Sequence, residues 1–243
     1  MLWIFDLDGT ITDHPSNFAE SVALALKERG VQFDEDLPGR LVRVVQARAA
    51  GREGSWGYFT AFNHGCKHVL GIRGLLRRLK FIRRFAKIYH DRLHLAEFYP
   101  GVVDALRHLK ERGHHVAILT AGSRREVEST LSRNREVLEH LVDAIITRED
   151  VPALKPSPVG IFALMERFGV TDRESVAMVG DSWHDVRAAR NAGVRSVAVL
   201  CGYGTREALA AEGPQFVVNS VSDVPSLLPL LEARMDEKGG DAA

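Results

Sequence analysis

The sequence is poor in several features that mark specialised proteins. Cys66 and Cys201 are its only cysteines among 243 residues, too few for a disulfide framework, so we expect a reducing, cytoplasmic environment. Neither charge dominates, because 32 Lys and Arg residues balance 32 Asp and Glu residues, which gives no case for nucleic acid as a partner. No apolar run approaches the ~20 residues that cross a bilayer. Charge begins at Asp6, so we expect neither a membrane partner nor a signal peptide.

Short apolar runs are what the sequence has instead, and 45% of its residues are hydrophobic, enough for a substantial core. From the second run onward, helical patterns separate one run from the next. This alternation predicts an α/β fold with a doubly wound parallel sheet covered on both faces. The predicted strands are Leu2–Phe5, His115–Leu119, Ala144–Thr147, Ser175–Val179, Ser196–Leu200 and, as an extension, Phe216–Val218.

The interval between the first two predicted strands has a different character. It contains no convincing strand, and Phe18–Arg29 and Leu75–Leu95 carry helical patterns. The interval is too long for a single crossover between parallel strands. We therefore expect a helical cap domain at residues 14–98, inserted after the first strand of a core formed by residues 1–13 and 99–231.

Polar side chains follow four of the predicted strands. In a doubly wound sheet, ligands bind outside the carboxyl ends of the strands, so we expect these side chains to meet at one edge. They comprise four carboxylates, one hydroxyl and one ammonium: Asp6 and Asp8 after the first strand, Thr120 after the second, Lys155 past the third, and Asp181 and Asp185 after the fourth.

These residue types suit one kind of chemistry. Carboxylates favour a hard cation such as Mg²⁺, which proteins hold by one or two carboxylates together with substrate phosphate. Lys155 and Mg²⁺ would together neutralise a phosphoryl group. The stretch Ser123–Glu126 is a capping box, and free N–H groups at such a helix start bind anions. We expect a phosphate oxygen between Thr120 Oγ and the amides of the turn that contains Ala121 and Gly122.

Ordinary structural roles compete with these assignments. Asp8 and Asp13 flank a turn where aspartate is common, and Asp185 could cap its own helix. The glycine-rich stretch 51–59 is either a flexible link or the cap loop through which Trp56 touches the substrate. The basic stretch 73–92 is either a solvated helix face or a positive surface for an anionic substrate or partner.

The motifs "DLDGT", "LTAGS", "LKPSP" and "GDSWHD", in this order and each after an apolar strand, resemble the four motifs of the haloacid dehalogenase (HAD) superfamily in its phosphatase branch. The helical insertion resembles the C1 cap of phosphoglycolate phosphatases and β-phosphoglucomutases. The stretches "GVVDALRHLKERGHHVAILT" and "CGYGT" look closer to the phosphoglycolate phosphatases.

The resemblance implies a role for each residue. Asp6 would be the nucleophile that forms an aspartyl-phosphate, and Asp8 would act as general acid and then general base. The Asp6 side chain, the Asp8 carbonyl and Asp181 would hold Mg²⁺, with Asp185 as a ligand or behind the ligands. Lys155 would fix Asp6 and the phosphoryl group.

We therefore expect a Mg²⁺-dependent phosphatase whose partner is a small phosphorylated metabolite, phosphoglycolate-like or a sugar phosphate. A phosphosugar mutase of the same build and a non-enzymatic phospho-acceptor regulator remain alternatives.

Overall fold

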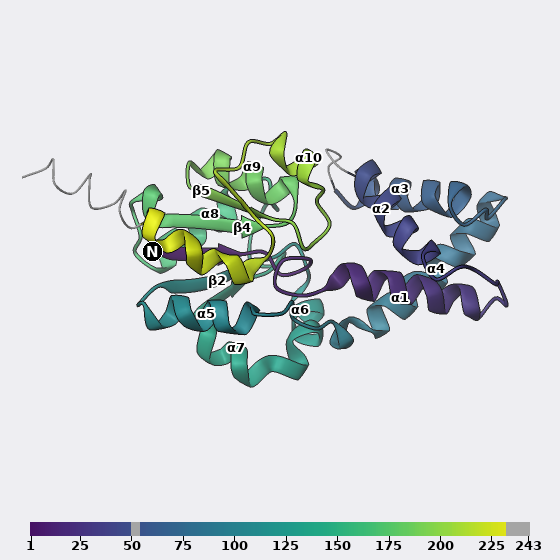
Figure 1. Cartoon of the computed structure of the whole chain (residues 1–243), viewed down its shortest axis with the longest axis horizontal. Coiled ribbons are helices and arrows are strands. Elements are labelled where there is room, and N and C mark those ends of the chain that lie inside the picture. The colour runs from purple at the N-terminus through teal and green to yellow at the C-terminus, as the bar shows by residue number, and fades with distance from the viewer. Residues whose placement is uncertain (50–53, 232–243) are drawn as a thin grey trace, which may run out of the picture.

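A computed structural model describes residues 1–49 and 54–231 of the chain. Its centre is a parallel sheet with strand order β3-β2-β1-β4-β5-β6 (Figure 1), so the first strand lies in the middle with its neighbours added on either side. The strands are β1 (Leu2–Phe5), β2 (His115–Leu119), β3 (Ala144–Ile146), β4 (Val176–Gly180), β5 (Arg195–Val199) and β6 (Phe216–Val218).

Helices cover both faces of the sheet because side chains on each strand alternate between the faces. On β1, Trp3 and Phe5 pack toward one face, while Leu2 and Ile4 pack toward the other. The first face is covered by α5 (Val102–Glu111), α6 (Arg124–Leu131), α7 (Arg135–Leu141) and η4 (Val221–Leu227). The second is covered by α8 (Val159–Arg167) and α9 (Trp183–Ala192). The short α10 (Arg206–Ala210) packs beside α9.

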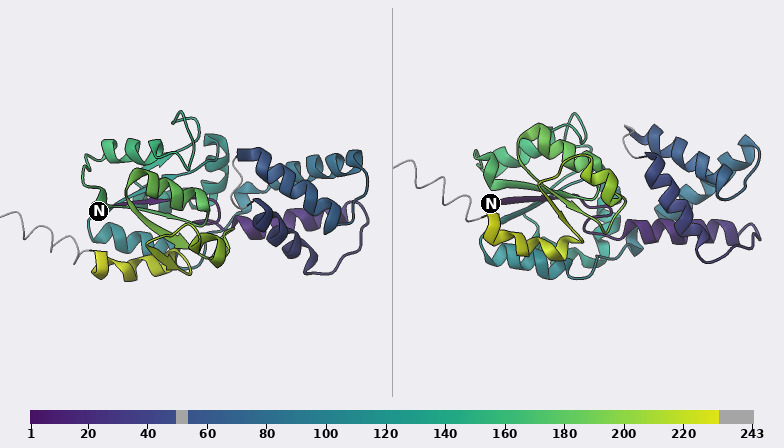
Figure 2. Two further views of the ribbon diagram at one scale, coloured as in Figure 1. Left: turned by 90° about the horizontal axis from the view of Figure 1, so that it is seen from above. Right: turned by 45° about the horizontal axis from the view of Figure 1, so that its top comes forward.

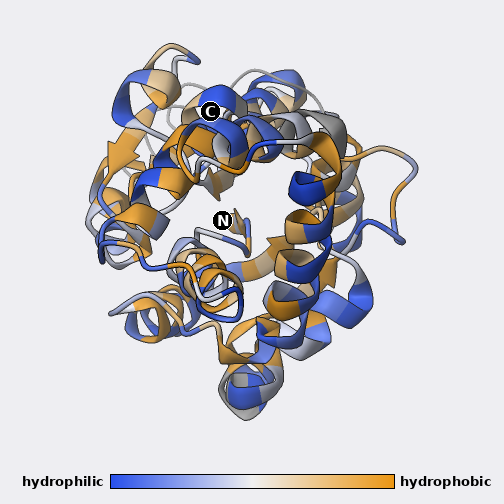
Figure 3. Cartoon of the chain, turned by 90° about the vertical axis from the view of Figure 1, so that its right-hand side faces the viewer, coloured by the Kyte–Doolittle hydropathy of each residue, from blue (hydrophilic) through white to orange (hydrophobic). Residues whose placement is uncertain are grey.

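A group of helices stands at one end of the molecule, away from the sheet (Figures 1 and 2). We call α1 to α4 the cap helices: α1 (His14–Lys27), α2 (Leu37–Ala49), α3 (Gly54–His68) and α4 (Leu75–Asp91), followed by the short η1 (Leu93–Leu95). Their turns mix hydrophobic and hydrophilic residues (Figure 3). The hydrophobic ones form a separate core around Phe62, Phe81 and Phe85. The cap helices therefore have a hydrophobic core of their own, distinct from the two that flank the sheet.

The chain leaves and re-enters the sheet region at one place. Thr12 pairs with Phe98 in an isolated antiparallel bridge. On either side of it, the Asp13 amide donates to the Glu97 carbonyl at 2.8 Å and the Tyr99 amide donates to the Ile11 carbonyl at 3.0 Å. Backbone hydrogen bonds therefore join the segment that leads into the cap helices to the segment that leads back from them. We call this pair of segments the narrow connection.

The predicted α/β fold and its parallel strands are confirmed, with strand ends shifted by one residue at most. The cap region contains two helices, α2 and α3, that the sequence patterns did not reveal. The interpretation of residues 51–59 as a loop is wrong from Gly54 onward, since α3 begins there. The preceding residues, Gly51 to Glu53, lie outside the described ranges. Every helix in those ranges is too short or too polar to be a transmembrane span.

Candidate active site

Three carboxylates meet at the carboxyl edge of the sheet. Asp6 follows β1 and donates its amide to the Val179 carbonyl of β4 at 2.9 Å, which places it beside the end of that strand. Asp181 follows β4 directly, and Asp185 lies in the first turn of α9. Oxygen atoms of these three buried carboxylates lie within 4.8 Å of one another. The parallel register thus brings together residues 175 positions apart, as the sequence predicts.

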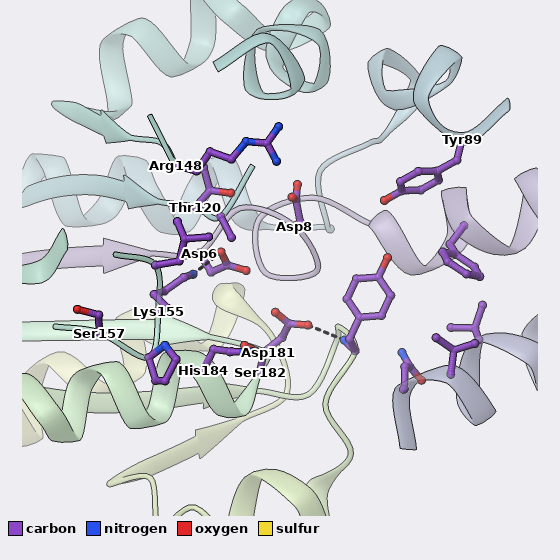
Figure 4. A pocket seen from close by; sticks show the side chains of 18 residues that line it. Asp6, Asp8, Tyr89, Thr120, Arg148, Lys155, Ser157, Asp181, Ser182 and His184 are labelled. Carbon is purple, nitrogen blue, oxygen red and sulfur yellow. Dashed lines mark hydrogen bonds and ion pairs between the residues drawn. The ribbon is translucent and has the colours of Figure 1, made fainter. Parts of the chain in front are cut away.

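Lys155 supplies the positive charge in this group. Its Nζ lies 2.6 Å from Asp6 Oδ1 and 2.6 Å from Asp185 Oδ1, and its side chain is only 7% exposed. Figure 4 shows the ammonium pointing at Asp6, with Asp181 on the neighbouring strand end. One buried ammonium therefore bridges two of the three carboxylates.

The charge of the group is unbalanced even with Lys155 present. Burial raises the pKa of Asp6 well above its ordinary value, against the lowering effect of Lys155. Burial, and then repulsion from Asp185, raises the pKa of Asp181 to about 7. Burial alone would lower the pKa of Lys155, but Asp185 and Asp6 outweigh it and raise that pKa. The carboxylates therefore favour a further positive charge at this position.

Local hydrogen bonds fix the orientation of Asp181 and Asp185. Asp185 accepts from the Ser182 amide at 3.0 Å and from Ser182 Oγ at 2.5 Å, so it caps its helix as well as binding Lys155. Asp181 accepts from Thr10 Oγ1 at 3.1 Å and from the Tyr203 amide at 2.5 Å. Backbone amides and side-chain hydroxyls together hold both carboxylates in place.

Two glycines that the sequence analysis overlooked make room for these side chains. A Cβ at Gly180 would lie 2.2 Å from Asp185 Cγ, and a Cβ at Gly202 would lie 2.2 Å from Asp181 Oδ2. Gly180 directly follows a predicted strand and Gly202 lies two residues after another, which is the signal that could have identified them. Only glycine allows the backbone to approach these carboxylates so closely.

The donor set fits a magnesium ion. Asp6, Asp181 and Asp185 offer hard oxygen ligands, and burial, followed by repulsion from neighbouring carboxylates, raises the pKa of both Asp6 and Asp181. The Asp8 carboxylate is not part of this set. It lies instead 3.0 Å from His14 Nε2.

Thr120 directly follows β2 and is 2% exposed. Its Oγ1 accepts from the Gly122 amide at 3.0 Å, so that amide is engaged with the protein. The capping box of Ser123 and Glu126 at the start of α6 has the expected geometry. Of the predicted phosphate-binding residues, Thr120 and Ala121 line the central cavity together with Lys155.

This cavity, of about 790 Å³, lies between the strand ends and the cap helices, within the usual size range of ligand sites. Asp6, Asp8 and Asp181 line its core side, and Tyr203 and Arg148 also reach it. The cap helices contribute a mostly apolar wall of Phe18, Val42, Val45, Gln46 and Tyr89. Trp56, the predicted cap contact, lies in α3, and its side chain falls outside the described part of the structure.

Comparisons with known proteins agree with this geometry. The model of the family described as Haloacid dehalogenase-like hydrolase matches residues 3–199. Phosphoglycolate phosphatase 1 of Pseudomonas aeruginosa is 30% identical over 228 residues, covering 92% of this chain and 78% of the relative. Pyrophosphatase PpaX of Bacillus cereus is 34% identical over 149 residues, 61% of this chain and 65% of the relative.

Solved structures give the same result for the fold. A crystal structure from Haemophilus somnus 129pt, named a predicted phosphoglycolate phosphatase, superimposes with a TM-score of 0.71 and 26% identity over 93% of this chain and 97% of the other. Both the sequence and the three-dimensional arrangement are therefore similar to those of hydrolases that act on phosphate compounds.

Proposed function

The chain belongs to the haloacid dehalogenase-like hydrolases and acts on phosphate esters, and we propose that it is a Mg²⁺-dependent phosphatase of small phosphomonoesters. The supporting observation is the buried group of Asp6, Asp181, Asp185 and Lys155 at the strand ends. Three carboxylates, two of them bridged by one ammonium, match a site that needs both a divalent cation and a phosphoryl group.

In the proposed mechanism, Asp6 is the nucleophile. Its carboxylate attacks phosphorus and displaces the leaving oxygen, which gives an aspartyl-phosphate. Lys155 holds the attacking carboxylate through the 2.6 Å contact and offsets charge on the phosphoryl group. A bound Mg²⁺, held by Asp6, Asp181 and the Asp8 carbonyl with Asp185 beside it, would supply charge neutralisation for the phosphoryl oxygens.

Asp8 carries the proton in both halves of the reaction. It protonates the leaving oxygen in the first half and takes a proton from the attacking water in the second. Its side chain is 37% exposed and faces the cavity, where a leaving group would lie. Thr120 and Ala121, which follow β2 at the same edge of the sheet, hold the phosphoryl oxygens.

The two parts of the chain divide the work. We assign residues 1–13 and 99–231 to a catalytic core and residues 14–98 to a cap that contacts the leaving group. The largely apolar cap wall supports a small phosphorylated metabolite as partner. Phosphoglycolate is the first substrate to test, because a phosphoglycolate phosphatase is among the relatives, and pyrophosphate is a useful comparison for the same reason. A cytoplasmic location fits a pair of free thiols.

The experiment that tests this function is phosphate release by purified protein and by the Asp6→Asn variant. The wild type should release phosphate from a panel of phosphomonoesters in Mg²⁺. The variant should release none, because an amide is nearly isosteric but far less nucleophilic. Asp104→Asn is the matched control, since Asp104 is 81% exposed on α5 and forms an ion pair with Arg107. Circular dichroism would verify that both variants are folded.

Two results would contradict the proposal. Phosphate release by a folded Asp6→Asn variant equal to that of wild type would remove Asp6 from the nucleophilic role. A wild type that takes up phosphate from a phosphodonor once and releases none would support a phospho-acceptor regulator instead.

A further inference from the structure

His14 connects the core to the cap through a single buried side chain. It is the first residue of α1, directly after the N-cap residue Asp13, and it is 3% exposed. Its Nε2 lies 3.0 Å from Asp8 Oδ1, and its Nδ1 lies 2.8 Å from the hydroxyl of Tyr89 on α4. The imidazole thus contacts the core on one edge and the cap helices on the other.

The two contacts differ in quality. The contact with Tyr89 is a hydrogen bond. The approach of Nε2 to Asp8 has hydrogen-bond length but not hydrogen-bond alignment, since Nε2 forms no hydrogen bond within the described residues. Catalytic hydrogen bonds are often poorly aligned before substrate binds and tighten afterwards. A small rotation of Asp8 or of the cap would complete this one.

Tyr89 and Tyr203 both line the cavity. The Tyr203 amide donates to Asp181. Burial raises the pKa of both phenols, so each keeps its proton for hydrogen bonding. Figure 4 shows the Tyr89 hydroxyl directed from the cap toward Asp8. Two polar contacts therefore run from Asp8 through His14 to Tyr89 on the cap helices.

The contact between His14 and Asp8 matters because the Asp8 side chain can otherwise take several orientations. With its side chain 37% exposed, the carboxylate has room to rotate away from the leaving oxygen. Proton transfer requires it to lie within hydrogen-bond reach of that oxygen. A buried imidazole fixed by Tyr89 restricts this rotation.

We propose that His14 is a positioning residue that orients the Asp8 carboxylate for proton transfer and makes that orientation depend on the cap through Tyr89. This inference rests on the proposed phosphatase function, in which Asp8 is the general acid. It adds a specific expectation: loss of His14 should damage protonation of the leaving group and spare the attack by Asp6.

Two substrates with different leaving groups separate these effects. Glycerol 2-phosphate releases a strongly basic alkoxide that must be protonated as it leaves. p-Nitrophenyl phosphate releases a weakly basic phenolate that needs little help. The readout is the ratio of kcat/KM for the alkyl substrate to kcat/KM for the aryl substrate. Slower folding or fewer active molecules would lower both values equally and leave this ratio unchanged.

His14→Phe removes both ring nitrogens and keeps a planar ring of similar size. The ratio should fall roughly 10- to 100-fold, part of the 10²–10⁴-fold that general acid–base catalysis contributes. The loss should appear in kcat more than in KM. Tyr89→Phe leaves the aromatic packing against Phe18 and Phe85 and should lower the ratio in the same direction by a smaller factor. This second variant also tests the inference if His14→Phe does not fold.

His115→Phe is the matched control. His115 also faces an aspartate, with Nδ1 3.9 Å from Asp143 Oδ2, but it lies at the start of β2, at the edge of the sheet away from the active site. It should leave the ratio unchanged. Equal slowing of both substrates in the His14 and Tyr89 variants, or no slowing, would overturn the inference while the phosphatase function stands. A wild type inactive on every phosphomonoester would overturn the proposed function itself.

Discussion

Removal of the Lys155 ammonium should make the stability of this protein depend on magnesium. In Lys155→Met, the side chain keeps its length and apolar stem but loses the charge that lies 2.6 Å from both Asp6 and Asp185. The carboxylates are then left buried without a partner. Removing one member of a buried ion pair typically costs about 3–5 kcal/mol, and we expect a loss of that size in EDTA.

The expected melting shift follows from the size of the chain. At about 2–4 °C per kcal/mol for a protein of this length, the variant should melt roughly 6–20 °C below wild type in EDTA. Magnesium should restore much of the difference, because a ligand at 100 times its dissociation constant stabilises by about 2.7 kcal/mol. The magnesium-induced rise in Tm should be larger in the variant than in wild type, since no ammonium competes for the carboxylates.

The assay is thermal unfolding by circular dichroism in EDTA and in a magnesium titration. Lys110→Met is the control, because Lys110 contacts Asp143 at 2.6 and 2.7 Å but this pair is about a quarter exposed. An exposed pair is worth about 0–1 kcal/mol, so this control should shift Tm little and show the same magnesium response as wild type. Equal melting of Lys155→Met and wild type in EDTA would refute the reasoning.

Three further outcomes are expected. Phosphate release should stop in EDTA and return with Mg²⁺ but not with Ca²⁺, whose looser coordination misplaces the nucleophile; undiminished turnover after exhaustive chelation would contradict the metal assignment. Gly202→Ala should weaken magnesium affinity roughly 10- to 100-fold, measured by calorimetry, because a Cβ there would displace Asp181; unchanged affinity would show that the carboxylate has room to shift. Asp143→Asn should reduce stability by about 1 kcal/mol at neutral pH. Burial would raise the pKa of Asp143, but Lys110 and the Val116 amide outweigh it and lower that pKa. In denaturant titrations, the difference from wild type should therefore begin to shrink below about pH 4 and vanish only below the lowered pKa of the folded protein; a difference that persists there would assign the effect to shape and not to charge.

The strands and the core residues of the site were predictable from sequence for a shared physical reason. Strands buried on both faces must be apolar throughout, so β1 and β2 stand out as continuous runs. The polar residues that interrupt such runs then mark the carboxyl edge of the sheet. Asp6 and Asp181 needed no other information to be placed together.

The contacts between core and cap were not predictable in this way. His14 and Tyr89 are separated by 75 positions, and their meeting depends on how α1 and α4 pack, which no local pattern encodes. The glycines of the cap were also misleading. Glycine is common in loops, yet Gly65 lies inside α3, where a Cβ would be 2.4 Å from Leu41 Cδ1. Here glycine permits close packing of two helices.

The narrow connection at Thr12 and Phe98 has a consequence for how this architecture can diversify. The chain leaves the sheet region and returns to it at one backbone bridge, so for the core the whole helical segment is one closed loop. The entropic cost of closing a loop grows only slowly with the number of residues in it. A different set of helices could be grafted between the same two residues, giving a new wall for the leaving group while Asp6 and Lys155 keep their places.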